Sequence, residues 1–109
     1  LIRLENLLND CFNDENISKN GLPTVKFISK QLNISPNYLS DMLRSITGQT
    51  TQQHIQDKLI EKAKEYLTST NLSVSEIAYQ LGFEYPQSFN KLFKKKTNQT
   101  PSEFKQLFN

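Results

Sequence analysis

Residues 73–101 read SVSEIAYQLGFEYPQSFNKLFKKKTNQTP, and this stretch decides the fold. Its apolar residues recur every three or four positions, the period of an α-helix, on both sides of a short break at 82–85. Ser73 is a good N-cap for the first helix, and Pro86 suits the first turn of the second. Two short helices joined by such a turn form a helix-turn-helix. The side chains expected to face inward are Ile77, Ala78, Leu81, Phe89, Leu92 and Phe93.

An earlier copy of the same unit precedes this stretch. Residues match at an offset of 49, and after a slip of one residue the match continues at an offset of 50. The matched pairs include Val25 with Val74, Ile28 with Ile77, Leu32 with Leu81, Leu39 with Phe89, Leu43 with Phe93 and Thr47 with Thr97. The slip falls where a turn can absorb it. We therefore expect a helix over 24–32, capped by Thr24, and another over 36–47, capped by Ser35.

The second helix of each copy has a defined end. Gly48 and Asn98 follow the two helices at equivalent positions, and both residue types suit the left-handed backbone at a helix C-terminus. Small residues, Ser29 and Ala78, stand where the two helices of each unit cross closely. In the first copy the expected inward stripe of the second helix is Leu39, Met42, Leu43 and Ile46.

The segment 51–69 between the copies predicts a long connecting helix. Its apolar residues at helical spacing are Ile55, Leu59, Ala63, Tyr66 and Leu67. Its other face alternates acids and lysines that can form i,i+4 pairs. A helix of this length spans about 28 Å, and successive major grooves on one face of duplex DNA lie about 34 Å apart. With a unit packed around each end, the rod can place two recognition helices in adjacent grooves.

The ends of the chain complete an all-α fold. We expect an opening helix over 1–15, a polar loop over 16–22 and a closing helix over 101–108. The inward residues of the opening helix are Leu4, Leu8, Cys11 and Phe12, and those of the closing helix are Phe104, Leu107 and Phe108. The single domain, 1–109, divides into a first subdomain (1–50), the linker helix (51–69) and a second subdomain (70–109).

Charge is unevenly distributed along the chain, whose 109 residues carry a net charge of +2. Residues 1–15 hold one basic residue and four acids, a net of −3, and the remainder is therefore +5. Residues 86–97 carry four lysines and no acid. A run of like charges is as often a solvated face as a binding surface, so charge alone does not indicate a binding site. The position of the lysines on a predicted recognition helix is what favours one.

Several classes of protein are disfavoured by composition. The chain has no apolar run long enough to cross a membrane, and its one cysteine, Cys11, cannot form an internal disulfide. His54 and Cys11 are too few to bind zinc, and no nucleophile, phosphate loop or carboxylate pair stands out. We therefore expect a cytoplasmic protein without catalytic residues, metal or cofactor. Because the chain starts without Met, we also expect it to be part of something longer.

The recognition helices would present the face opposite their apolar stripes to base edges. In the first copy the base-reading candidates are Asn37, Ser40 and Asp41, and the phosphate candidates are Tyr38 and Arg44. Asp41 can accept from cytosine, but an acid also repels phosphates, so its pairing with Arg44 is an equal alternative. Tyr38 can instead pack partly into the core.

The second recognition helix is the more basic. Its base-reading candidates are Gln87, Asn90 and Lys91, because amides pair with adenine and lysine with guanine. Ser88, Lys94 and Lys95 are the candidates for phosphate contact, which positions the protein without specifying sequence. This surface should supply most of the salt-dependent affinity.

Two other readings stay open at this stage. Paired helical units can bind proteins instead of DNA, and the acidic first helix could serve as such a surface. An enzyme, or a base-processing fragment fused to a catalytic domain, is less favoured because the 109 residues lack a nucleophile or a set of metal ligands. The lysines of the second recognition helix favour DNA.

Several motifs resemble the signature of the AraC/XylS transcription regulators. The motifs that carry the resemblance are Ile77-Ala78, Gly82-Phe83, Ser88-Phe89, Phe93-Lys94-Lys95 and Thr100-Pro101, supported by Tyr38-Leu39-Ser40, Gly48, Ala63 and Tyr66-Leu67. The likeness covers nearly all of 24–108. Three positions depart from the pattern. Asn98 stands for a glycine, Leu59 for a linker arginine, and Lys105 for an arginine after the last aromatic residue.

The resemblance implies seven helices, with two helix-turn-helix subdomains that bind one asymmetric site in promoter DNA. It also implies that the domain is the C-terminal output part of a bacterial regulator, an activator in our expectation. A preceding N-terminal region would sense a ligand or signal and could mediate dimerisation. Contact with RNA polymerase is a further candidate interaction.

Overall fold

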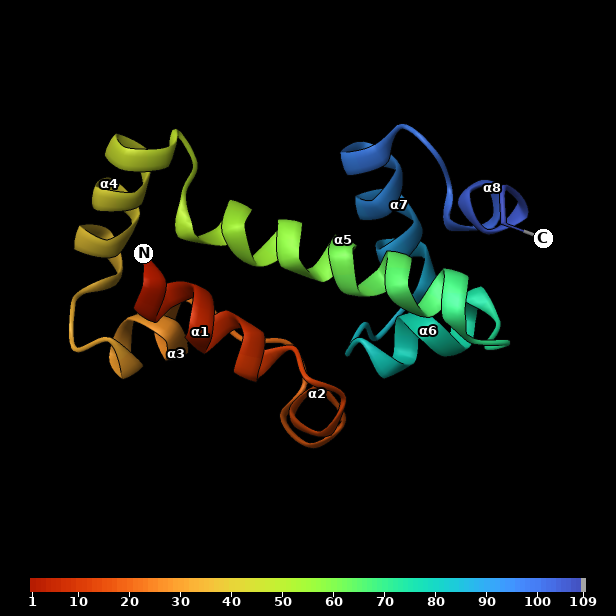
Figure 1. Ribbon diagram of the computed structural model, residues 1–109, viewed down its shortest axis with the longest axis horizontal. Helices are drawn as coiled ribbons and strands as arrows, with labels where there is room; N and C mark the ends of the chain where they lie inside the picture. Colours follow the sequence, from red (N-terminus) through yellow and green to blue (C-terminus); the bar gives the residue numbers. More distant parts are fainter. Residues whose placement is uncertain (109) are drawn as a thin grey trace.

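The computed structural model describes residues 1–108, and these form eight α-helices (Figure 1). Their bounds are α1 Ile2–Cys11, α2 Asp14–Asn20, α3 Val25–Gln31, α4 Pro36–Thr47, α5 Thr51–Ser69, α6 Val74–Gln80, α7 Pro86–Thr97 and α8 Pro101–Gln106. In Figure 1, α5 runs across the middle, with α1, α3 and α4 around one end and α6, α7 and α8 around the other. Among the described residues, no helix has both the length and the apolar character that crossing a membrane requires.

The bounds of the helices follow from their caps. The hydroxyls of Thr24 and Ser35 accept hydrogen bonds from backbone amides in the first turns of α3 and α4. Capping boxes open α5, α6 and α8, where Thr50, Ser73 and Thr100 pair reciprocally with the residue three positions later. As a result, α4 and α5 cover the same residues that the sequence predicts, and the short helices differ from expectation by one or two residues at their ends.

The N-terminal segment differs from expectation, so the described chain has eight helices and not seven. The expected helix over 1–15 ends at Cys11, and the expected polar loop contains α2. Asn13 caps α2 by accepting from the backbone amide of Asn16 at 2.8 Å, and acids in the first turn favour the positive end of the helix dipole. Ile17 anchors this helix, since only 2% of its surface is exposed.

One core runs along α5 and serves both ends of the molecule. Its residues on α5 are Ile55, Leu59, Ile60, Ala63, Tyr66 and Leu67. At the α7 end, aromatic rings continue the core: the centroids of Phe89 and Phe93 lie 5.9 Å apart, and those of Phe93 and Phe104 lie 5.6 Å apart. Leu59 is buried, so the position where the family pattern has arginine contributes apolar packing.

Three residues predicted to be inward are exposed. Leu107 and Phe108 are 66% and 59% exposed, because α8 ends at Gln106 and the helical period that would turn them inward stops there. Ile46 is 60% exposed. It lies in the last turn of α4, which extends beyond the short helix α3 (Figure 1), so none of the helices within residues 1–108 covers it.

Candidate nucleic-acid interface

The turn before each recognition helix has the same backbone in both copies. Asn33 and Gly82, 49 residues apart, both have positive φ, 59° and 92°. The next amide then bonds back across the turn: Ile34 N donates to Ser29 O at 3.1 Å, and the second copy has the matching bond at 3.0 Å. Ser29 is buried at the helix crossing, as the small side chain predicts. The repeat in the sequence is therefore a repeat in structure.

The recognition helices also end alike. Gly48 and Asn98 are both left-handed, with φ of 80° and 64°, and their amides donate to carbonyls four residues earlier. This confirms that asparagine replaces the family's glycine without changing the backbone. In each copy the following glutamine amide donates to the threonine hydroxyl of the last helical turn at 3.2 Å, for example Gln49 to Thr47.

The outward face of α4 carries most of its candidates. Asn37, Tyr38, Asp41 and Arg44 are all exposed, and Tyr38 is 60% exposed, so it does not pack into the core. Ser40 differs: its hydroxyl lies 3.1 Å from the hydroxyl of buried Thr51 and points toward the start of α5. Within residues 1–108 no ion pair joins Asp41 to Arg44, which leaves the alternative reading of Asp41 without support.

The outward face of α7 carries all of its candidates. The exposed side chains are Gln87, Ser88, Asn90, Lys91, Lys94 and Lys95, opposite the fully buried rings of Phe89 and Phe93. Lysines in the last turn also complement the negative end of the helix dipole. The two faces thus differ in charge, because α7 exposes three lysines and α4 exposes one arginine and one acid.

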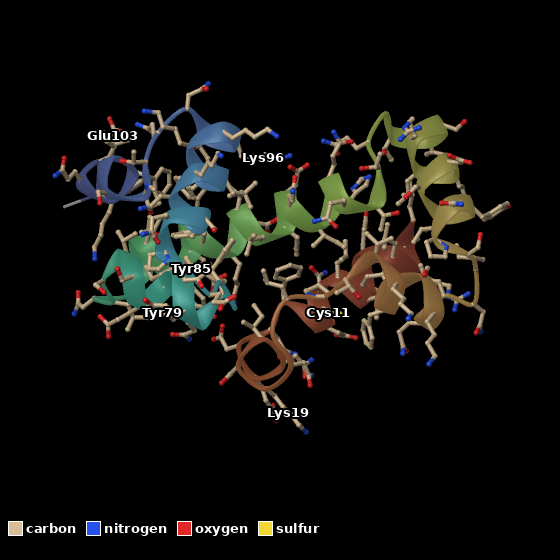
Figure 2. All side chains as sticks on the ribbon, turned by 180° about the vertical axis from the view of Figure 1, so that it is seen from behind. Cys11, Lys19, Tyr79, Tyr85, Lys96 and Glu103 are labelled. Atoms are coloured by element: carbon tan, nitrogen blue, oxygen red, sulfur yellow. The ribbon has the colours of Figure 1, made fainter. Side chains whose placement is uncertain are left out.

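The fourth lysine of α7 is engaged within the protein, a contact that sequence reasoning did not find. Lys96 Nζ lies 3.2 Å from Asp57 Oδ1 on α5, and the other oxygen of Asp57 accepts from Gln49 Nε2 at 3.0 Å. Figure 2 shows Lys96 directed from α7 toward the middle of the long helix. Lys96 and Asp57 are 39 positions apart, so no local sequence pattern reveals their contact.

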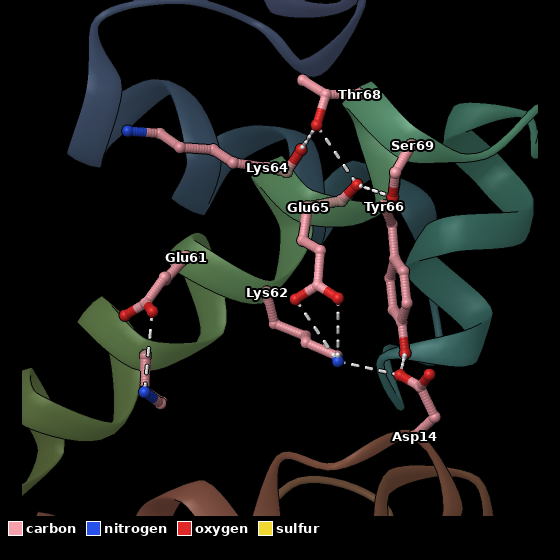
Figure 3. Close-up of polar contacts among 9 residues, drawn as sticks. Asp14, Glu61, Lys62, Lys64, Glu65, Tyr66, Thr68 and Ser69 are labelled. Carbon is pink, nitrogen blue, oxygen red and sulfur yellow. Dashed lines mark hydrogen bonds and ion pairs between the residues drawn. The ribbon is translucent and has the colours of Figure 1, made fainter.

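A second polar cluster ties α2 to α5. Tyr66 donates to Asp14 Oδ1 at 2.6 Å, and Lys62 Nζ lies 2.8 Å from the same oxygen (Figure 3). The hydrogen bond from Lys62, together with that from Tyr66, lowers the pKa of the Asp14 carboxyl. Burial and the neighbouring carboxylate raise the pKa of the Tyr66 hydroxyl. The cluster holds the N-terminal helices on the linker helix.

No group of metal ligands appears in the described part of the chain. His54 Nε2 lies 2.9 Å from the Thr47 hydroxyl and so supports the turn after α4. Cys11 is half-buried, and burial raises the pKa of its thiol. It lines a cavity of about 540 Å³ formed by residues of α1 to α3 and their connections, and none of the lining residues belongs to α4 or α7.

Known proteins resemble the chain over most of its length. The model of a family described as "Helix-turn-helix domain" matches residues 28–107. An uncharacterized HTH-type transcriptional regulator in the cgkA 5' region of Pseudoalteromonas carrageenovora is 38% identical over 100 residues, covering 92% of this chain and 54% of the relative. The chain spans 8%, 54% and 35% of the first three curated relatives that it matches.

Solved structures share the fold. The C-terminal domain of the two-component response regulator yesN from Fusobacterium nucleatum is 32% identical, with a TM-score of 0.75, and the match covers 94% of this chain and 98% of that one. The DNA-binding domain of AdpA, solved with a target DNA, has a TM-score of 0.78 at 19% identity, covering 96% and 91%. At that identity the second likeness concerns the fold.

Proposed function

Because this chain belongs to the AraC/XylS-type helix-turn-helix family, a family of DNA-binding domains, we propose that α4 and α7 enter successive major grooves on one face of promoter DNA. The observation that carries this proposal is the outward face of α7, where three exposed lysines accompany the exposed amides of Gln87 and Asn90. Lysines attract the phosphate backbone, and amides can pair with base edges.

The two faces have different parts in this proposal. Asn37 and Asp41 on α4, with Gln87, Asn90 and Lys91 on α7, read base edges. Tyr38, Arg44, Ser88, Lys94 and Lys95 contact phosphates and fix the register. Ser40, the sixth candidate for base reading, is the weakest of the set, because its hydroxyl is already hydrogen-bonded to that of Thr51. The charge difference supports α7 as the source of most salt-dependent affinity.

We further propose that the domain is the output part of a longer transcription regulator. The first curated relatives extend well beyond the matched region, and the similar solved domain is the C-terminal part of a response regulator. A signal received by another region would then control promoter binding, with dimerisation and contact with RNA polymerase as means of control. Such a role places the protein in the cytoplasm with the DNA.

Selection of bound duplexes from a random pool tests the proposal. An enriched site with two conserved blocks about one helical turn apart is the expected result, and affinity should fall as salt rises. Enrichment of one block would assign base reading to a single unit. Absence of both enrichment and salt-dependent binding would refute DNA binding and favour a protein-interaction module. A partner of the acidic segment 1–15, which spans α1 and the start of α2, would then be sought.

A further inference from the structure

The carboxylate of Asp57 joins the two helix-turn-helix units at the middle of α5. One oxygen accepts from Gln49, which follows α4, and the other lies 3.2 Å from the ammonium of Lys96, in the last turn of α7. A single side chain of the linker helix thus contacts the last turn of α7 and the turn that follows α4. We propose that Asp57 is a positioning residue that sets the separation of α4 and α7, and hence the spacing of the two DNA blocks that the chain accepts. This inference rests on the proposed function.

Both partners of Asp57 have little freedom. Gln49 starts from a fixed backbone, because its amide donates to the Thr47 hydroxyl, which itself donates to Leu43 O at 2.8 Å. The side chain of Lys96 is only 21% exposed, against 47% for Asp57. Packing of Lys96 therefore reduces the side-chain entropy that this ion pair must overcome.

The internal repeat shows that this contact is specific to one copy. Gln99 has the same backbone position after α7 as Gln49 has after α4. Fifty residues beyond Asp57, however, stands Leu107, which is exposed and has no carboxylate. The turn is thus common to both copies, whereas the acid that joins the units occurs only on the linker helix.

Contacts on the opposite face of α5 also hold the two units together. Tyr66 follows Asp57 by nine residues, which is half a turn out of phase on an α-helix, and it bonds to Asp14 of α2 (Figure 3). Beyond α2, the chain approaches the second unit so closely that a Cβ on Gly82 would lie 3.3 Å from Leu22 N. The two units are therefore held on both sides of the linker helix.

The first test uses duplexes in which the spacing of the two selected blocks is shortened or lengthened by one base pair. Such a change moves one block by about 3.4 Å and rotates it by roughly 34°. The measured quantity is the ratio of Kd for the altered spacing to Kd for the selected spacing. In Asp57→Ala and in Lys96→Met we expect this ratio to fall about two- to fivefold, the range typical of one ion pair.

Glu61→Ala is the matched control. Glu61 lies one turn along α5, is exposed, and forms its ion pair within α5, with Lys58. Both alanine variants remove one acid, and this change in net charge should tighten binding to every duplex. Only Asp57→Ala should, in addition, lower the spacing ratio. Equal ratios in the parent, Asp57→Ala and Glu61→Ala would overturn the inference.

A distance measurement decides the inference without DNA. Spin labels at Ser45→Cys on α4 and Ser88→Cys on α7, in a Cys11→Ser background, report the separation of the recognition helices by double electron–electron resonance. We expect a broader distance distribution in Asp57→Ala than in the parent or in Glu61→Ala. An unchanged distribution would refute the role of Asp57 even if DNA binding is established, and a broadened one would support it even if the pool selection fails.

Discussion

Replacing Lys94 and Lys95 with alanine should weaken binding to every duplex alike and flatten its dependence on salt. Both side chains are exposed on α7, whereas Lys96 is paired with Asp57. Each lysine that neutralises a phosphate adds about 0.9 to the slope of log K against log salt, so the double variant should lose about 1.8. When salt rises from about 50 to 200 mM, the affinity should therefore fall less steeply in the variant than in the parent. The difference is roughly 3.5-fold per lysine removed, or about 12-fold for the pair.

Fluorescence anisotropy with the selected duplex and with a scrambled duplex measures this effect. The two duplexes should show the same loss of slope, because phosphate contacts carry no sequence information. Lys19→Ala is the control, since Lys19 is exposed on α2, away from α7 (Figure 2). A double variant with an unchanged slope but an altered base preference would show that these lysines read bases, and the assignment of roles would be wrong.

Other substitutions test the remaining assignments. Gln87→Ala and Asn90→Ala should each relax preference at particular base pairs, at a cost of about 1–3 kcal/mol in binding to the selected site and little change on scrambled DNA, which competition binding measures. Tyr66→Phe should lower the free energy of unfolding in urea by about 0.5–1.5 kcal/mol, because it removes the hydrogen bond to Asp14; an unchanged midpoint would contradict this. The pKa of Asp14 is lowered by hydrogen bonds from Lys62 and Tyr66, so its contribution to stability is present above about pH 4 and lost as pH falls through the lowered pKa; the parent should therefore lose more stability than Asp14→Asn over that range of acid titration. Phe93→Ala should cost about 3–5 kcal/mol in thermal unfolding, because its ring is fully buried between Phe89 and Phe104, and a small loss would mean that the aromatic core closes over the gap.

The parts of the fold that are set by local chemistry were predictable from sequence. The bounds of α4 follow from Ser35 and Gly48, and the capping threonine of α5 marks its start. The outward faces of α4 and α7 follow from helical period alone, which is why nearly all the predicted site residues are exposed. Whether those residues contact DNA as assigned stays a prediction.

Features that depend on contacts between distant residues were not predictable in the same way. The helix α2 is short and polar, and its formation depends on burial of Ile17 and on the Asn13 cap. Periodicity placed Ile46 on the inward side of α4, but none of the described helices extends far enough to cover it. The bridge from Gln49 to Lys96 through Asp57 requires both units to be in place before its partners meet.

The linker helix α5 also limits how such a protein can change through evolution. One residue added within Thr51–Ser69 would advance the second unit by about 1.5 Å and turn it by about 100°, carrying α7 off the face that it shares with α4. About seven added residues, or two full turns, would restore the phase but separate the units by a further 10 Å or so. Substitutions at the other exposed positions of α5, Asp57 apart, meet no such barrier. Descendants of this chain should therefore keep the length of α5 and Asp57, while its other solvent-facing residues change freely.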